Sequence, residues 1–439
     1  MFTIDRDTEI TPQLMCSYIK LHKDAVTKYN TLERYYKGQH SILNRVKRAD
    51  ASNNKIVCNH AKYISDVASG YLMGEPIGYK SESGASIDVL ADMLKLSGTD
   101  VQDMDLAKMQ SVFGVAYELI YLNRSGDVKL TTTDPRNSFI VYDNSVELNT
   151  VAGCYYYPYT DVKTQKLAGY VCTVMTDGTQ YDFKITESFA IKGEIAETAN
   201  LFGMVNLIEV WNNNERQGDF EQLISLIDAY NVLQSDRLND KEQFVNALMV
   251  LKGQTLGDTS GEKTETYRDI KDTGVIEITA ESAVEYLTRQ FDEASVEVLR
   301  KSLENDLHKF SCVPAMTDEN FSGTVSGVAM KYKLLGLEQI TKIKERYFAE
   351  GVKERLKLFK RIAEVKGQGT FDVDDIQIIF TRSLPANEIE LSQIIGNLTG
   401  IVSQETLLSQ VPFVKNPAQE IKRISEEKKK SLEEQFIIN

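Results

Sequence analysis

Two long helical patterns on either side of a short polar segment place the strongest constraint on how this chain can fold. Over residues 293–311, apolar side chains recur at spacings of three and four, which is typical of a helix with one apolar stripe: Val296, Leu299, Leu303, Leu307 and Phe310. Pro314 ends this pattern. A second helical pattern covers residues 327–366 and would span roughly 60 Å if straight. Gly336 and Gly351 are its expected bend points.

The segment between these helices, PAMTDENFSGTVSG (314–327), is polar and has no evident catalytic chemistry. Gly323 and Gly327 permit sharp backbone turns, and Ser326 is a candidate N-cap for the second helix. We interpret the whole as a helical hairpin whose loop projects into a solvent-filled space.

The N-terminal part of the chain is also predicted to be helical, over residues 1–45, 55–73 and 86–122, with a break near Gly98. In the first helix, Thr11 is the expected N-cap, Pro12 the first helical residue and Gly38 the stop. Its predicted apolar stripe consists of Leu14, Tyr18, Leu21, Ala25 and Tyr29.

Residues 128–212 are rich in Val, Thr, Tyr and Ile and predict a mostly antiparallel β unit, with a tight hairpin at TDGT (176–179). A helix follows over 218–253, stopped by Gly253. Residues 254–290 are rich in Gly, Thr and charges, and end in two predicted strands, TGVIEIT and AVEYLT. A late strand is expected at 375–385 and helix over 388–434. These elements indicate an α+β fold that is mainly α.

Composition limits the class of protein. A chain of 439 residues can form two or three packed units. Its formal net charge of −14 predicts that any contact with DNA is weak, local or transient. The five cysteines are scattered without a CxxC pair, which favours a reducing compartment. No signal peptide and no apolar run of about 18 residues is visible, so we expect a protein made and folded in a cytoplasm.

A search for catalytic motifs finds none that satisfies its spacing. GQTLGDTSGEKT (253–264) is not a phosphate-binding loop, because Glu262 separates Gly261 from Lys263, and we interpret it as an exposed, mobile loop. The four histidines form no HExxH motif, and Cys58-Asn59-His60 stands alone, so no zinc site is expected. We expect His308 to be solvated or interfacial.

Acidic residues form two groups that are candidate metal ligands: Asp372, Asp374 and Asp375 before the late strand, and Asp236 and Asp240 on one helix face. Without a nearby general base or histidine, we interpret both groups as surface carboxylates. The sequence thus predicts no enzyme, no metal and no cofactor.

Six stretches in collinear order resemble one known family. They are RYYKGQHSILNR (34–45), NNKIVCNHAKYISDVASGYLMGEPI (53–77), DPRNSFIVYDNS (134–145), LIEVWNNNERQGDFEQLISLIDAYNVLQSDRLND (207–240), FSGTVSGVAMKYKLLGLE (321–338) and VSQETLLSQVPFVKNPAQEIKRISEE (402–427). Through these stretches the chain resembles the portal proteins of long-tailed double-stranded DNA phages, in the branch found in phages of Gram-positive bacteria.

The resemblance implies a function that the residues alone do not. Portal proteins form a ring of about twelve identical subunits at one capsid vertex, and the genome passes through its central tunnel. The implied partners are other copies of the chain, double-stranded DNA, the terminase large subunit, a head-completion adaptor, and the major capsid and scaffolding proteins, but no membrane. The implied location is the virion, after assembly in the host cytoplasm.

The same resemblance assigns roles to parts of the chain. It implies a wing (1–219), two stem helices (220–253 and 291–313), a clip (254–290), a tunnel loop (314–326), a kinked helix and late strand that return through the wing (327–387), and a crown (388–439).

It also assigns candidate site residues. In the tunnel loop these are Thr317, Asp318, Glu319, Asn320, Phe321, Ser322, Gly323, Thr324, Ser326 and Gly327. Neutral hydroxyl and amide groups there should let DNA slide, and Asp318 and Glu319 should repel phosphates, while Lys331 and Lys333 supply a weak attraction. Candidate clip residues for docking terminase or adaptor are Gly257, Asp258, Lys263, Thr264 and Arg268.

Two other classes of protein remain as alternatives. One is a cytoplasmic ring or scaffold protein without a DNA channel, which particle images would distinguish by the lack of an axial hole. The other is a metal-dependent nucleic-acid enzyme that uses the acidic groups, which a nuclease assay with magnesium or manganese would test.

Overall fold

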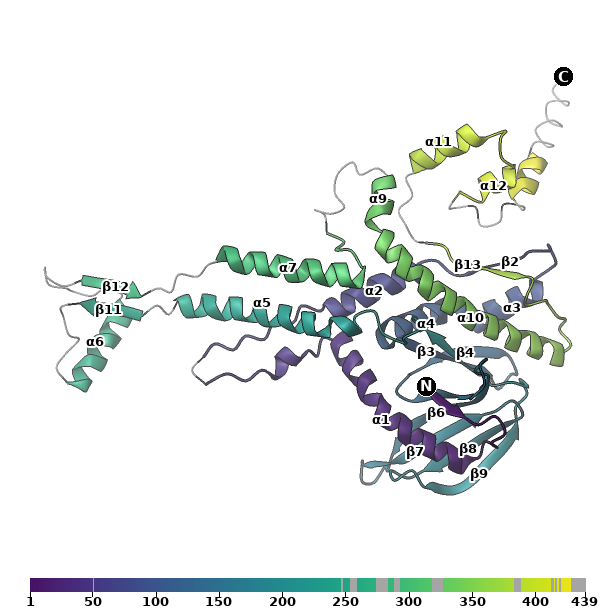
Figure 1. Ribbon diagram of the computed structural model, residues 1–439, viewed down its shortest axis with the longest axis horizontal. Helices are drawn as coiled ribbons and strands as arrows, with labels where there is room; N and C mark the ends of the chain where they lie inside the picture. Colours follow the sequence, from purple (N-terminus) through teal and green to yellow (C-terminus); the bar gives the residue numbers. More distant parts are fainter. Residues whose placement is uncertain are drawn as a thin grey trace. The chain divides into compact units, whose positions relative to one another are not determined.

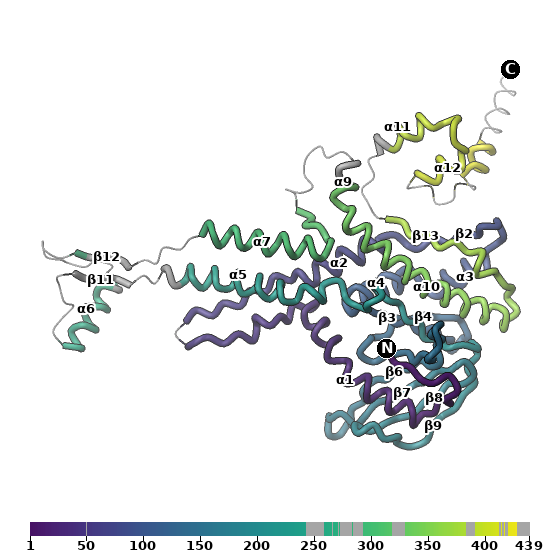
Figure 2. The backbone as a smooth tube through the Cα atoms, viewed as in Figure 1, coloured from purple at the N-terminus to yellow at the C-terminus, as the bar shows by residue number. Residues whose placement is uncertain are grey.

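The computed structural model describes residues 1–49, 51–245, 248–252, 259–273, 283–287, 293–317, 327–382, 388–411, 414, 417 and 420–427. The chain divides into two compact units (Figures 1 and 2). The first consists of Met1–Ala315 and Gly336–Arg382, and the second of Met316–Leu335 and Ser383–Asn439. The described residues form a mixed α and β fold, which confirms the predicted class at that level. The division into wing, stem, clip and crown stays a prediction.

Helix α1 (Pro12–Tyr36) begins and ends where the sequence predicts. Thr11 caps it through a 3.3 Å hydrogen bond from a first-turn amide, and Gly38 follows at φ +76°. The predicted stripe is wrong, because Leu21 is 54% exposed and Ala25 is also exposed. The buried face lies one residue further along: Met15, Cys16, Ile19, His22, Val26, Leu32 and Tyr35. The helical spacing of the apolar residues was therefore predicted correctly, but the face of the helix that is buried was not.

Three further helices follow: α2 (His60–Met73), α3 (Asp88–Ser97) and α4 (Thr99–Phe113). The predicted helix over 86–122 is wrong beyond Phe113, since β3 (Val115–Leu122) is a strand. Gly114 makes the change of direction at φ +81°, where a Cβ atom would lie 2.3 Å from the carbonyl oxygen of Arg216. Every side chain from Val115 to Ile120 is buried, so β3 lacks the alternation that identifies a strand.

A six-stranded sheet has the order β1-β5-β6-β7-β8-β9. Its strands are β1 (Phe2–Ile4), β5 (Ser138–Asp143), β6 (Thr150–Thr160), β7 (Leu167–Met175), β8 (Thr179–Ile185) and β9 (Ile191–Ala199). All pairs are antiparallel except β1 with β5, which confirms the predicted β unit. The predicted hairpin joins β7 to β8, where Thr176 N donates to Thr179 O at 2.8 Å. Helix α1 covers the sheet through a cluster that includes Met15, Ile19 and Val174.

A second sheet, β10-β3-β4, packs against the long helix α10 (Leu335–Val365). Its other strands are β4 (Val128–Thr133) and β10 (Leu207–Trp211). Helix α10 continues through Gly351, and the bend predicted there stays a prediction. Glycine allows close packing at this position, since a Cβ atom at Gly351 would lie 2.6 Å from Val210 Cγ2. One turn further, the fully buried Arg355 binds Glu118 at 2.8 Å and also binds Asp103.

The remaining elements of the first unit refine the prediction. Helix α5 (Ile224–Val245) ends earlier than predicted, and β11 (Leu248–Lys252) replaces its last turns and pairs with β12 (Ala283–Leu287). The predicted AVEYLT strand is thereby confirmed, whereas TGVIEIT beyond Thr273 lies outside the described residues. Helix α7 (Glu293–Ser311) is confirmed, and the late strand β13 (Ile376–Ile379) pairs with β2 (Gly78–Ser81). Short 3-10 helices lie at η1 (Ser41–Asn44) and η2 (Glu221–Leu223).

The second unit contains α9 (Gly327–Lys333), α11 (Glu388–Leu398) and α12 (Gln404–Leu408). The helix predicted over 327–366 is thus interrupted at Leu334, between α9 and α10, and the helix predicted over 388–434 is broken after Leu398. Among the helices in the described ranges, none has the length and apolar character of a membrane span.

Candidate functional site

Most of the predicted tunnel loop falls outside the described residues, namely Asp318, Glu319, Asn320, Phe321, Ser322, Gly323, Thr324 and Ser326. Thr317 is exposed, and Gly327 is the first residue of α9. Lys331 and Lys333 are exposed on α9. Two residues apart on a helix, their Cα–Cβ directions differ by about 200°, so they start from opposite sides of α9.

The chain leaves the first unit through a well-fixed turn at the end of α7. Val313 is fully buried, and its carbonyl oxygen lies 2.9 Å from His308 Nδ1, which must therefore donate. The carbonyl oxygen of Pro314 accepts a 2.8 Å hydrogen bond from the Tyr63 hydroxyl. Between α7 and this turn, Cys312 adopts φ +56°, which is uncommon for a residue other than glycine.

His308 lies at the interface of α7 and α2, as the interfacial alternative predicted. Its ring centroid is 5.7 Å from that of Tyr63 and 6.0 Å from that of His60. Burial lowers the pKa of His60 to about 4, and His308 adds a smaller contribution in the same direction, so the His60 imidazole is neutral at pH values near 7.

The chain re-enters the first unit at the start of α10, where Glu338 is held by two partners. The Tyr71 hydroxyl donates to Glu338 at 2.9 Å, and Arg382 Nε donates to the same oxygen at 3.0 Å. Burial acts to raise the pKa of Glu338, but the hydrogen bonds from Arg382 and Tyr71 outweigh burial and lower it. Burial and the neighbouring Glu338 raise the pKa of Tyr71 to about 12, so its hydroxyl keeps its proton. The sequence search missed Tyr63, Tyr71 and Arg382, because nothing local to them signals such distant contacts.

Helices α5 and α7 lie side by side (Figure 1) and are joined by charged groups. Arg237 binds Glu293 at 3.2 Å and Glu297 at 3.0 Å, and Arg300 donates to the Tyr230 hydroxyl at 3.3 Å. These polar contacts occupy the face between the two helices.

Only some residues of the apolar stripe predicted on α7 are therefore buried within one chain. Leu307 is fully buried, but Leu299 is 50% and Phe310 is 53% exposed. Beside them, Val298 is 70% exposed. The outward side of α7 thus carries apolar side chains that the described residues of the first unit leave exposed.

The extended segment that precedes α2 runs beside α5 (Figure 2), and a ladder of polar side chains on α5 holds it. Asn239, Ser235 and Asn231 accept hydrogen bonds from alternate backbone amides of that segment, Asn54 N at 2.7 Å, Ile56 N at 3.0 Å and Cys58 N at 2.8 Å. Four helical residues rise about 6 Å and two extended residues about 6.6 Å, so the two periods match over this length. Small polar residues every fourth position in a helix are the sequence signal that would have revealed the ladder.

Replacing Asn231 with Ala should lower the free energy of unfolding by about 2 kcal/mol, because it leaves the amide of Cys58 and the Nδ1 atom of His40 without their partner. Chemical denaturation measures the effect. The matched control is Asn305→Ala at an exposed position of α7, where the change should stay within about 0.5 kcal/mol. Equal effects of the two substitutions would show that the ladder does not stabilise the fold.

The predicted clip residues divide between described and undescribed positions. Gly257 and Asp258 lie outside the described residues, while Lys263, Thr264 and Arg268 are exposed on α6 (Ser260–Thr273). The loop predicted at 253–264 is wrong from Ser260 onward, since that part is helical. A capping box starts the helix: Glu262 N donates to Thr259 Oγ1 at 3.3 Å, and Thr259 N donates to Glu262 Oε2 at 3.2 Å. The T-x-x-E spacing was the sequence signal for this helix.

One residue of each acidic group considered as a metal ligand has other partners. Asp236 binds Arg45 and Lys47, and Asp375 accepts hydrogen bonds from Ser81 and Ser83. Within the described residues, no group of three or more His, Cys, Asp or Glu side chains is placed to hold a metal ion.

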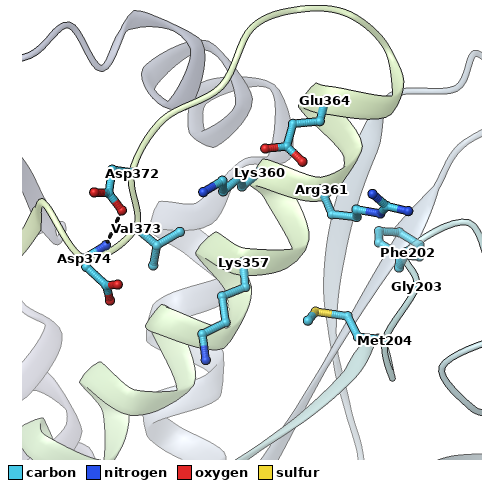
Figure 3. Close-up of a pocket in the computed structure, with 10 residues that line it drawn as sticks. All are labelled: Phe202, Gly203, Met204, Lys357, Lys360, Arg361, Glu364, Asp372, Val373 and Asp374. Carbon is cyan, nitrogen blue, oxygen red and sulfur yellow. Dashed lines mark hydrogen bonds between the residues drawn. The ribbon is translucent and has the colours of Figure 1, made fainter.

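A cavity of about 360 Å³ lies between α10 and two loops (Figure 3). The Lys360 side chain points toward the loop of Asp372 and Val373, and Arg361 points toward Phe202. The lining combines cations with carboxylates, and its charged side chains are exposed or half-buried, so the cavity indicates no particular ligand.

Comparison with known proteins gives a consistent result. A family model described as "Phage portal protein, SPP1 Gp6-like" matches residues 17–434. The portal protein of Bacillus phage SPP1 is 26% identical over 396 residues, which cover 86% of this chain and 76% of that protein. The portal protein of Clostridium phage phiCD119 is 23% identical over 435 residues, which cover 92% of this chain and 94% of that protein. The chain therefore belongs to the SPP1 Gp6-like family of phage portal proteins.

Proposed function

We propose that copies of this chain form a ring of about twelve subunits at one vertex of a phage capsid, and that double-stranded DNA enters and leaves the capsid through its axial channel. The family match over residues 17–434 is the observation that carries this proposal. In the ring, the segment 314–326 faces the channel. Electron microscopy of the assembled protein tests the proposal, because a scaffold protein without a channel would lack an axial hole.

The outward face of α7 supports self-association. Since ion pairs join α7 to α5, the exposed Val298, Leu299 and Phe310 are available to a second molecule. In a cyclic ring each subunit uses two different surfaces, one toward each neighbour. We assign this face of α7 to one of those two contacts.

The charge of the chain suits a channel that does not hold DNA. A net charge of −14 opposes tight phosphate contacts, and Lys331 and Lys333 are described cations that follow the proposed channel segment in the sequence. The assembled ring should therefore bind duplex DNA weakly at physiological salt, with a dissociation constant above about 1 µM. Filter binding over a salt series measures this constant. Nanomolar retention would contradict a sliding channel.

Helix α6 is the proposed docking surface for the terminase large subunit and later the head-completion adaptor. Lys263 and Arg268 are exposed there. Replacing both with Glu should abolish terminase capture while rings still form, because exposed charges control recognition more than folding. Pull-down with terminase and microscopy of the same sample test this. Loss of the rings themselves would count against the assignment.

The chain's other proposed partners are the major capsid and scaffolding proteins during assembly. We assign the packaging motor to the terminase and no ATP hydrolysis to this chain, since the only segment that approaches a phosphate-binding loop has Glu262 between Gly261 and Lys263. Magnesium- or manganese-dependent nuclease activity of the purified protein would favour the enzyme alternative instead.

A further inference from the structure

We infer that helix α2 fixes both points at which the chain leaves and re-enters the first unit, and that Tyr63 and Tyr71 are positioning residues for the segment between those points. The contacts of α2 are structural observations and do not depend on the proposed function. The consequence for DNA passage rests on the proposed function, in which that segment faces the channel.

At the exit point, three groups hold the backbone of Val313 and Pro314. The Tyr63 hydroxyl donates to Pro314 O at 2.8 Å, His308 Nδ1 donates to Val313 O at 2.9 Å, and Ser311 Oγ accepts from Val313 N at 3.2 Å. The Val313 side chain is fully buried. Of these groups, only Tyr63 comes from outside α7 and the turn that follows it, so it ties the exit point to another part of the fold.

At the re-entry point, Leu337 is fully buried and Glu338 binds Tyr71 and Arg382. The two points also lie next to each other, because a Cβ atom placed on Gly336 would be 3.5 Å from Cys312 Cβ. The chain therefore leaves and returns at one place, and a single helix contacts it on both sides.

Helix α2 is suited to act as a rigid support. Ala61, Ile64, Ala68 and Leu72 are almost fully buried along one face, and Asn59 Oδ1 caps the helix by accepting from Lys62 N at 3.0 Å. Tyr63 and Tyr71 are eight residues apart, which separates them by about 12 Å along the helix axis. Their spacing is set by the helix itself, so the relative positions of the two contacts cannot change without unfolding it.

Tyrosine makes this role testable, since replacement by Phe keeps the ring and removes only the hydroxyl. Tyr63→Phe removes the hydrogen bond at the exit, and Tyr71→Phe removes the one at the re-entry, where Arg382 still binds Glu338. Tyr36→Phe is the matched control. The Tyr36 hydroxyl also bonds to α2, through Asp66 at 2.7 Å and Lys62 at 3.2 Å, but on its exposed side and away from both points.

The experiment measures hydrogen exchange in assembled rings of wild type and the three variants, with peptides that cover 312–317 and 335–341. Loss of one hydrogen bond should raise exchange about fivefold near the affected point in Tyr63→Phe and Tyr71→Phe, and less than twofold in Tyr36→Phe. The amount of DNA packaged per particle should fall at least about tenfold in the first two variants at unchanged thermal stability and ring yield, and stay at the wild-type value in Tyr36→Phe.

Unchanged exchange in both variants would overturn the inference that α2 holds these points. Raised exchange with normal packaging would overturn the positioning role. Failure of the proposed function has a different signature, because wild-type rings would then show no DNA crosslinks from a photoreactive residue at position 331, whatever the tyrosine variants do.

Discussion

Replacing Arg355 with Met should lower the free energy of unfolding by about 3–5 kcal/mol. Arg355 is fully buried and binds Glu118 and Asp103, which are also buried. Methionine fills similar volume but leaves two carboxylates in the protein interior without a cation. Urea denaturation measures this decrease in stability. The matched control is Lys353→Met on the same helix. Lys353 pairs with the exposed Glu350, so this substitution should lower the free energy of unfolding by less than about 0.5 kcal/mol.

The decrease in unfolding free energy caused by Arg355→Met should be smaller at low pH than at high pH. Burial raises the pKa of Glu118 in the folded protein, and Arg355 opposes that rise. Without Arg355 the folded pKa goes up further. A carboxyl with a raised folded pKa stabilises the fold below its unfolded pKa and loses that contribution as pH rises through its folded value. The difference between Arg355→Met and wild type should therefore be smaller at about pH 5 than at about pH 8. A difference that grew on acidification would contradict this.

Replacing Val298 and Leu299 together with Glu should convert rings to monomers. Both side chains are at least half exposed on α7, and we assign them to the contact between neighbouring subunits. Burying two unpaired carboxylates should cost several kcal/mol at each contact, about 2 kcal/mol or more per group. A closed ring contains as many such contacts as subunits, so the cost is repeated around it. Size-exclusion chromatography with light scattering measures the mass of the assembly.

Val162→Glu is the control for this prediction, because Val162 is 91% exposed in the turn between β6 and β7. It should form rings as wild type does. The monomers of the double variant should keep the wild-type circular dichroism spectrum, since the substituted side chains are not part of the core. Rings of normal mass from the double variant would exclude this face of α7 from the subunit contact.

The sequence predicted those parts of the fold that have local signals. Thr11 and Gly38 bounded α1 because capping is determined by neighbouring residues, and Asp177-Gly178 located the β7–β8 hairpin, although neither residue adopts the positive φ angle that the sequence predicted. The predictions failed where tertiary contacts determine the type of an element or the face that it buries. Strand β3 is buried throughout and shows no alternation, and α1 is rotated by one residue relative to the predicted stripe.

The candidate site was predictable to a smaller extent. The family resemblance identified the segment around 314–326 and the two helices beside it, and α7 is in the expected place. The contacts of Tyr63 with Pro314 and Tyr71 with Glu338 join residues more than 250 positions apart, and no local pattern reports them. The helical conformation of α6 was missed although its capping box was visible, because the glycine and threonine content around it favoured a loop.

The most direct test of the whole account is an electron cryomicroscopy reconstruction of the assembled protein from phage particles that contain DNA. We expect a closed ring with an axial opening wide enough for a duplex, density for DNA along its axis, and residues 314–326 of every subunit nearest to that density. A ring or particle without an axial opening, or residues 314–326 enclosed inside each subunit, would contradict the account.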